Sequence, residues 1–351
     1  MTAADLHTIV VGRDAMGCRF EAVFNAGEVP EATELGCQAL DVVDEIEARI
    51  SVYRSTSELA LVNAAAGGAW VRISADTFAL LSLARELHAA TAGAFDIAAG
   101  PLVRAWGFLA RQGRTPAEAD LVAALAASGT AALELDPDGP RARLARAGAE
   151  LNPGAIGKGW AIDRAIEWLA AAGVPSVLVH GGQSSVRARG VQGPALPGRA
   201  GWKVGLRHPL RPGRRLATLT LVDRALGTSG SGTQFFIERG RRLGHILDPR
   251  TGRPAEGVLS ATVVAPTGAE ADAWATALYV LGPAGVDRAA PPGSERGAVL
   301  VLPGPADTLR IVVANLTAAE VAIEAEPGLE VTWPQEPGSA GTGAEPTPRP
   351  A

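Results

Sequence analysis

Segments with helical spacing fill the first half of the chain, and short β-branched segments fill most of the second half. Residues 31–50 carry apolar side chains three and four positions apart, as one buried face of a helix requires. Later segments such as SVLVH, LATLTLV and LSATVV are separated by Gly or Pro, which is typical of strands. Two helical segments, WAIDRAIEWLAAAG and AEADAWATALYVLG, interrupt them. This segregation predicts an α+β fold rather than a doubly wound parallel sheet.

The domain organisation follows from the same pattern. A helical part at about 31–130 is expected to pack beside a sheet-rich part at about 151–332 with a mixed or antiparallel sheet. We expect both to form one domain over residues 1–333, because nothing between them resembles a linker. Residues 334–351 are rich in Pro, Gly, Ser and Thr. They cannot bury enough surface to offset their chain entropy, so we expect a disordered tail.

Charge and apolar pattern exclude several classes of protein. The formal net charge is −5, without the basic excess of a nucleic-acid-binding protein. No segment approaches the ~18–20 apolar residues of a transmembrane helix. The N-terminus lacks a signal-peptide pattern and a lipobox cysteine, which favours a cytoplasmic location. Cys18 and Cys37 are too few for a disulfide framework or a closed zinc site, and we expect both to be reduced and mostly buried.

The glycine-rich segment GAIGKGWAIDRA, from Gly154 to Ala165, is a candidate phosphate site. Glycine lets the backbone approach a ligand closely, and the following helix N-terminus offers free N–H groups to an anion. Lys158 adds a positive charge. The segment lacks the Gly-Lys-Ser/Thr spacing of a Walker A loop. An ordinary glycine-rich connection is the alternative.

A second candidate is the pair Asp272 and Thr276 in ADAWATAL. Residues four apart lie on one face of a helix, where a carboxylate and a hydroxyl offer two oxygen ligands of the kind Mg²⁺ prefers. The alternative is a helix-capping Asp and a Thr bonded to its own helix.

Three further segments could line a ligand. HILDPRTGRP, from His245 to Pro254, has strong turn chemistry, and its simpler interpretation is a turn capped by Asp248. ALGTSGSG reads as a strand running into a loop of small hydroxylated residues suited to phosphate contact. TAGAFD and HGGQSS read as fixed turns.

Taken in order, these motifs resemble the ApbE family of FAD:protein FMN transferases. The resemblance is carried by AMGCRF, ISVYRSTSELALVN, TAGAFD, GAIGKGWAIDRA, GGQSS, WKVGLRHP, GTSGSG, HILDPRTGRP and ADAWATALYVLG, and it spans about residues 14–315. It implies Mg²⁺-dependent transfer of FMN from FAD to a Thr or Ser hydroxyl of an acceptor flavoprotein, with release of AMP. It also implies a ligand cleft between the helical and sheet-rich parts.

The resemblance assigns roles residue by residue. For Mg²⁺ it implies Asp272, Thr276 and the backbone carbonyl of Ala155. For FAD it implies Met16, Tyr53, Asp96, Gly154, Lys158, Thr228, Ser229 and His245. Catalytic roles fall to His245, Asp248 and Lys158, and the base that takes the hydroxyl proton is His245, Asp248 or Asp96.

The chain departs from the family pattern at three points. Gln183 stands where many relatives carry an acid, Ser231-Gly232 follows the TSG motif, and Ile97-Ala98 replace Pro and Thr. An FAD-binding protein, or a pyrophosphatase that cleaves FAD to FMN and AMP without modifying a protein, is therefore the alternative function.

Overall fold

The computed structural model describes residues 7–193, 201–211, 213–230, 232 and 234–333. The predicted tail at 334–351 lies outside these ranges. The largest sheet has nine strands in the order β1-β2-β6-β7-β10-β15-β16-β17-β19, and only the β17–β19 pair is parallel. Its strands are β1 (Thr8–Ala15), β2 (Cys18–Asn25), β6 (Val177–Gly181), β7 (Ser185–Arg189), β10 (Ala225–Gly230), β15 (Ser260–Ala265), β16 (Gly297–Pro303), β17 (Leu309–Ala314) and β19 (Glu330–Thr332).

Smaller sheets complete the strand inventory. A three-stranded sheet joins β18 (Val321–Ile323), β9 (Arg215–Leu221) and β8 (Trp202–Arg207), and another joins β3 (Val71–Arg72), β5 (Arg141–Leu144) and β4 (Leu133–Asp136). Two hairpins pair β11 (Phe235–Glu238) with β12 (Arg241–Gly244) and β13 (Leu247–Asp248) with β14 (Arg253–Pro254). The α-helices are α1 (Ala32–Ile50), α2 (Glu58–Ala64), α3 (Ala75–Ala90), α4 (Gly100–Ala105), α5 (Glu118–Ala127), α6 (Gly157–Ala171), α7 (Gly268–Leu281) and α8 (Val286–Ala289).

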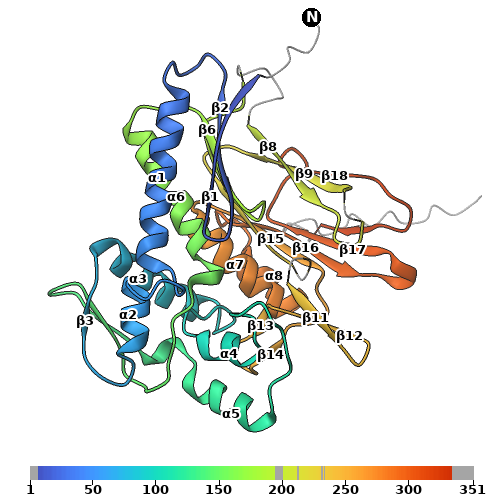
Figure 1. Cartoon of the computed structure of the whole chain (residues 1–351). Coiled ribbons are helices and arrows are strands. Elements are labelled where there is room, and N and C mark those ends of the chain that lie inside the picture. The colour runs from blue at the N-terminus through green and yellow to red at the C-terminus, as the bar shows by residue number, and fades with distance from the viewer. Residues whose placement is uncertain (1–6, 194–200, 212, 231, 233, 334–351) are drawn as a thin grey trace, which may run out of the picture.

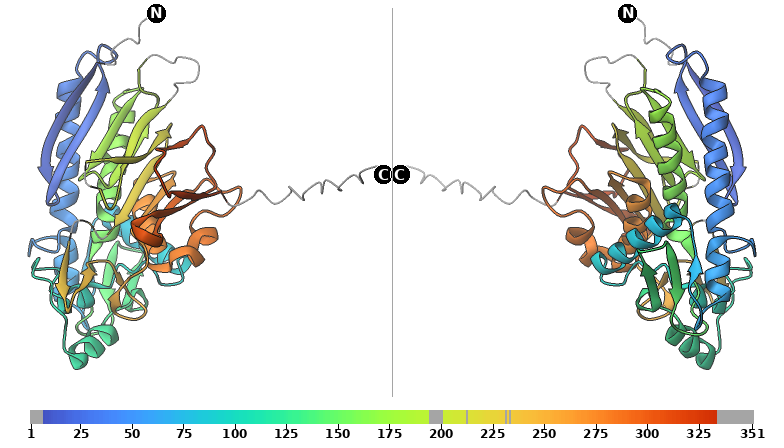
Figure 2. Two further views of the ribbon diagram at one scale, coloured as in Figure 1. Left: turned by 90° about the vertical axis from the view of Figure 1, so that its right-hand side faces the viewer. Right: turned by 90° about the vertical axis from the view of Figure 1, so that its left-hand side faces the viewer.

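The layers are visible in Figures 1 and 2. Helices α1, α6 and α7 pack on one face of the nine-stranded sheet, and the β8–β9–β18 sheet covers part of the other face. Helices α2 to α5, with β3 to β5, form what we call the small lobe, below the large sheet in Figure 1. The predicted α+β class with a mixed, mostly antiparallel sheet is confirmed.

The core between helices and sheet explains these elements. Phe20 and Phe24 of β2 meet Leu40 and Ile46 of α1 in one cluster, and each is at most 2% exposed. Burying a side chain of this size contributes about 1.5–3 kcal/mol. Period-2 spacing on the strand and three- and four-residue spacing on the helix therefore converge on one interior.

Two details differ from the sequence-based expectation. Residues 8–25 form a β1–β2 hairpin whose second strand pairs with β6, so the large sheet begins before the helical segments. The expectation that both cysteines are mostly buried is wrong for Cys37, which is exposed on α1, while Cys18 is half-buried. Over the part of the chain that the structure describes, none of the helices combines the length and apolarity needed to cross a membrane.

Candidate active site

Helices α6 and α7 touch backbone to backbone where each begins. A β-carbon on Gly159 would lie 2.0 Å from the carbonyl oxygen of Gly268, and one on Gly268 would lie 2.7 Å from the carbonyl oxygen of Gly159. Real β-carbons do not tolerate such distances, so both positions require glycine for this crossing. The glycine-rich motif and the start of the ADAWATAL helix are thereby held together (Figure 1).

Each helix caps the other with a buried carboxylate. Asp163 of α6 accepts hydrogen bonds from the backbone N–H groups of Gly268 (2.7 Å) and Ala269 (2.9 Å) at the start of α7. Asp272 of α7 accepts one from the N–H of Gly159 in the first turn of α6, at 2.8 Å. Both acids satisfy N–H groups that a helix N-terminus leaves without partners. Asp272 therefore does cap a helix, as the alternative interpretation of the sequence predicted, but it caps α6 and not its own helix α7.

Burial raises the pKa of both acids at this crossing, Asp163 and Asp272. The side chain of Asp272 is buried, and the hydroxyl of Ser185 donates to its two oxygens at 2.8 and 2.9 Å. Burial raises the pKa of Asp272 to about 6, although the charge of Lys158 and the hydrogen bonds from Ser185 and Gly159 oppose this. The cost of burying the charged carboxylate therefore exceeds what Lys158 and these hydrogen bonds return.

Thr276 and Ser229 lie next to each other. Their hydroxyl oxygens are 3.0 Å apart, which joins α7 to β10. Thr228 contacts the Thr262 hydroxyl at 2.9 Å and donates its N–H to the Ser184 carbonyl at 2.7 Å. The expectation that Thr228 and Ser229 lie in a loop is wrong, because β10 continues to Gly230 and its pairing with β15 holds them in the sheet.

Lys158 lies in the first turn of α6, which begins at Gly157. Its ammonium donates to the hydroxyl of Ser184, and its charge acts on the titration of Asp272, His245 and Cys18. Met16 joins this region, since its Cε lies 3.6 Å from where a β-carbon on Gly157 would be.

Gly154 and Ala155 form a 3-10 turn immediately before α6. The side-chain oxygen of Asn152 accepts a hydrogen bond from the N–H of Gly154 at 2.9 Å and so caps the start of this turn. Gly154 is exposed and Ala155 is half-buried, so both adjoin the surface beside the helix crossing.

His245 follows the β11–β12 hairpin. Its Nδ1 lies 3.0 Å from the carbonyl oxygen of Gln234, and the Phe108 ring packs edge-on against it with centroids 6.3 Å apart. Burial lowers the pKa of His245, and the Lys158 charge acts in the same direction, whereas the bond to Gln234 opposes them. The imidazole is therefore held in its neutral form near neutral pH.

The carboxylates of Asp248 and Asp96 are engaged in local hydrogen bonds. Asp248 forms a bidentate ion pair with Arg250 at 2.8 Å for both bonds, within its own turn. Asp96 accepts from the N–H of Ala98 and from both the N–H and the hydroxyl of Thr130. These contacts suit turn formation, and they leave little capacity for a proton from a substrate.

Tyr53 lies on the loop after α1 and is 73% exposed. Its hydroxyl donates to the carbonyl of Leu109 in the small lobe at 3.4 Å. Arg111 follows closely in the same segment, and its Nη2 lies 3.1 Å from where a β-carbon on Gly17 would be. Tyr53, Arg111 and the Met16–Gly17 turn therefore gather where the small lobe meets the β1–β2 hairpin.

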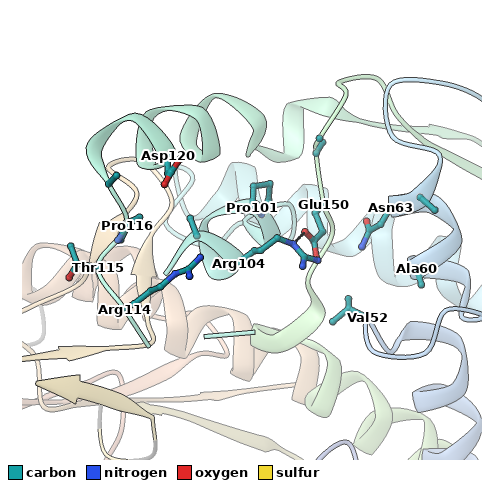
Figure 3. Close-up of a pocket in the computed structure, with 15 residues that line it drawn as sticks. Val52, Ala60, Asn63, Pro101, Arg104, Arg114, Thr115, Pro116, Asp120 and Glu150 are labelled. Atoms are coloured by element: carbon teal, nitrogen blue, oxygen red, sulfur yellow. Dashed lines mark hydrogen bonds and ion pairs between the residues drawn. The ribbon is translucent and has the colours of Figure 1, made fainter. Parts of the chain in front are cut away.

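We call Tyr53, Arg111 and the Met16–Gly17 turn the rim of the candidate site, and two cavities lie near it. One, of about 500 Å³, is lined by Met16, Gly17, Cys18, Glu47 and Arg54 among others. A larger one of about 1010 Å³ lies in the small lobe, where Arg104 pairs with Glu150 and Arg114 projects nearby (Figure 3). The larger cavity contains none of the predicted site residues, although Val52 at its edge precedes Tyr53. Size alone therefore does not locate the chemistry.

Among the residues that touch the predicted ones, the sequence assigned no role to Ser184, Ser185 and Gln234. The two serines belong to the GGQSS motif, which we interpreted as a glycine turn without considering its hydroxyls. Their place in that motif could have marked them as candidates. Nothing in the sequence marks Gln234, because only the fold brings it to His245.

The α+β fold thus gathers acids, hydroxyls and a lysine at the crossing of α6 and α7, an arrangement suited to a cation and a phosphate side by side. The ApbE family profile matches residues 16–296, and the chain belongs to this family. It is 30% identical over 282 residues to the FAD:protein FMN transferase of Escherichia coli K12, covering 79% of each chain, and 34% identical over 268 residues to that of Treponema pallidum, covering 73% of each. The apo flavinyl transferase ApbE of Pseudomonas stutzeri superimposes with a TM-score of 0.76 at 28% identity, covering 90% of this chain and 97% of that one.

Proposed function

We propose that this chain transfers the FMN half of FAD to a Thr or Ser hydroxyl of an acceptor protein in a Mg²⁺-dependent reaction that releases AMP. The observation that carries the proposal is the hydrogen bond from Gly159 to Asp272. This bond brings the buried carboxylate of Asp272, which could hold a cation, close to Lys158, which could bind a phosphate. Transfer from a pyrophosphate requires positive charge from a metal ion and from a side chain at the same place. Similarity to proteins named FAD:protein FMN transferase supports the same reaction.

The residues around Asp272 fit Mg²⁺. The raised pKa of Asp272 marks a carboxylate that a cation would stabilise in its ionised form. The hydroxyl of Thr276 and the carbonyl of Ala155 would add neutral oxygen ligands. Within the described ranges no group of three or more His, Cys, Asp or Glu side chains could hold a metal ion, so water and phosphate oxygens would complete the coordination, as is usual for Mg²⁺. Bound Mg²⁺ would polarise the pyrophosphate and offset its developing charge.

The chain's own residues would position FAD and move one proton. Lys158 would neutralise charge on the pyrophosphate, and Met16, Tyr53, Gly154, Thr228 and Ser229 would line the ligand. The acceptor oxygen would form a bond to the FMN phosphorus as the bond to the AMP oxygen breaks. His245 would be the base, because its imidazole is kept neutral while Asp248 and Asp96 are engaged in their turns.

The test uses FAD, Mg²⁺ and an acceptor protein chosen because the Escherichia coli K12 relative, run in parallel as the positive control, attaches FMN to it. We expect an FMN mass increase on the acceptor and an equal amount of AMP, both lost on chelation with EDTA. FMN and AMP without an adduct would identify a pyrophosphatase, and intact bound FAD would identify a binding protein. Either result contradicts the proposal.

Variants connect the reaction to the helix crossing. Asp272→Ala should lower the transfer rate about a thousandfold, equivalent to roughly 4 kcal/mol. Thr276→Val, which is nearly isosteric, should lower it less and raise the Mg²⁺ concentration needed for half-maximal rate. Asp287→Ala removes an exposed acid of α8 and serves as the matched control. Equal rates for Asp272→Ala and the control would exclude a role for this carboxylate.

A further inference from the structure

The β11–β12 hairpin is fastened to the small lobe through one of its two faces. Phe236 lies with its ring centroid 5.9 Å from that of Phe108 and 6.3 Å from that of Trp106. Leu243, its cross-strand partner, packs into the same cluster. On the opposite face, Phe235 and Ile237 are 43% and 69% exposed. The hairpin is therefore a strap whose inner face is fixed to the segment around Phe108.

Gln234, which immediately precedes β11, joins this strap to His245. Its side-chain Nε2 donates to the carbonyl of Phe108 at 3.0 Å. Its backbone carbonyl accepts the N–H of His245 at 3.2 Å and lies 3.0 Å from Nδ1 of the same residue. A carbonyl oxygen can only accept, so Nδ1 must carry the hydrogen. In the neutral imidazole the lone pair is then on Nε2.

We propose that Gln234 is a positioning residue for His245: it fixes the imidazole as the Nδ1–H tautomer, so that Nε2 is available to the acceptor hydroxyl. This inference rests on the proposed function. The proton of the hydroxyl passes to Nε2 as the new oxygen–phosphorus bond forms and AMP leaves with the electrons of the broken bond. The edge-on ring of Phe108, inclined by 74° to the imidazole, restricts its rotation. Gln234 and His245 thus depend on one anchor in the small lobe.

The alternative is that Gln234 merely fastens the hairpin. The chain offers a control, because Glu238 on the same hairpin accepts a hydrogen bond from the hydroxyl of Thr115 in the small lobe. Thr115→Val removes that tie without any contact to His245. Gln234→Met keeps the length of the side chain and the backbone carbonyl but removes the donor to Phe108. A fastening role predicts similar effects of the two substitutions, whereas a positioning role predicts different ones.

The experiment measures transfer kinetics with FAD, Mg²⁺ and the same acceptor protein. Gln234→Met should lower kcat about tenfold, a part of what a general base contributes, and leave the KM for FAD within about twofold. Gln234→Asn, which retains a donor, should recover part of the rate. Thr115→Val should match the wild type. Equal losses in Gln234→Met and Thr115→Val, or an unchanged kcat in Gln234→Met, would overturn the inference.

A second readout does not depend on turnover. In protein labelled with ¹⁵N-histidine, His245 (assigned through His245→Gln) should give the signature of the Nδ1–H tautomer at pH 7.5. Gln234→Met should shift it toward a mixture of tautomers. An Nε2–H tautomer in the wild type would refute the positioning role even if transfer occurs. Absence of transfer in the wild type, with the Nδ1–H tautomer present, would instead refute the proposed function and with it the role of Nε2 as base.

Discussion

The helix crossing and the rim of the candidate site are built in opposite ways. At the crossing, Gly159 and Gly268 bring two backbones into contact, and Asp163 and Asp272 are each held by several hydrogen bonds away from water. At the rim, Tyr53 is 73% exposed and its hydroxyl makes a single long hydrogen bond of 3.4 Å. The crossing is preorganised by the fold, while the rim is loosely held.

This difference separates two kinds of effect. Electrostatic stabilisation of a transition state requires groups that do not reorganise during the reaction, and the crossing supplies them. Few buried contacts restrain the rim, so its residues can adjust to a ligand at low cost. Substitutions at the crossing should therefore alter folding and chemistry together, whereas substitutions at the rim should alter ligand binding alone.

The largest combined effect on folding and transfer is expected from Gly159→Ala. The new methyl group would meet the carbonyl oxygen of Gly268, so α6 and α7 must separate and the Gly159–Asp272 hydrogen bond must break. We expect the free energy of unfolding to fall by about 3 kcal/mol and the transfer rate to fall at least a hundredfold. Urea unfolding and single-turnover transfer measure the two quantities.

Gly139→Ala is the matched control for this variant. Gly139 lies in the turn between β4 and β5, and no heavy atom lies within 4 Å of its β-carbon position. It should change neither quantity. If Gly159→Ala lowered stability but kept the full transfer rate, the crossing would be a structural feature only, and its contrast with the rim would lose its functional meaning.

His245 lies between these extremes and should respond to pH. Burial lowers its pKa below the ordinary 6.5, so the folded protein favours neutral imidazole while the unfolded chain takes up a proton near pH 6.5. Its contribution to stability is present above pH 6.5 and is lost as pH falls toward the folded-state pKa. We expect the wild type to lose more free energy of unfolding than His245→Gln between pH 7.5 and 5.5. Parallel losses, measured by urea unfolding, would mean that His245 is accessible to solvent like a rim residue.

The sequence predicts the crossing in part, and the reason is local. Asp272 and Thr276 are four residues apart, so their common helix face follows from helical geometry alone. The glycines around Lys158 likewise predict a close approach to the backbone, which we expected from a ligand, and at Gly159 the structure places the backbone of Gly268 there. The order of helical and strand segments was enough for the α+β class, because each segment carries its own period.

What the sequence could not supply are contacts between distant segments. Ser185 reaches Asp272 across 87 positions, and Gly159 reaches it across 113. The same limit explains why we expected Thr228 and Ser229 in a loop. A Gly-Thr-Ser-Gly run has the composition of a loop, and only its pairing with β15, which the sequence does not reveal, makes it a strand. Tertiary pairing outweighs local composition there.

Tyr53→Ala tests the rim and should have the smallest effect of the three. An exposed side chain with one weak hydrogen bond contributes little to folding, so the free energy of unfolding should change by less than about 0.5 kcal/mol. If the ring packs on the flavin, its loss should raise the KM for FAD severalfold, up to about tenfold, because aromatic pairs contribute about 0.5–1.5 kcal/mol. The kcat at saturating FAD should remain near the wild-type value, since Tyr53 touches none of the groups at the crossing. Tyr53→Phe keeps the ring and should restore the KM. A fall in kcat in Tyr53→Ala would show that the rim is coupled to the crossing through the small lobe, and the two regions would then have to be treated as one unit.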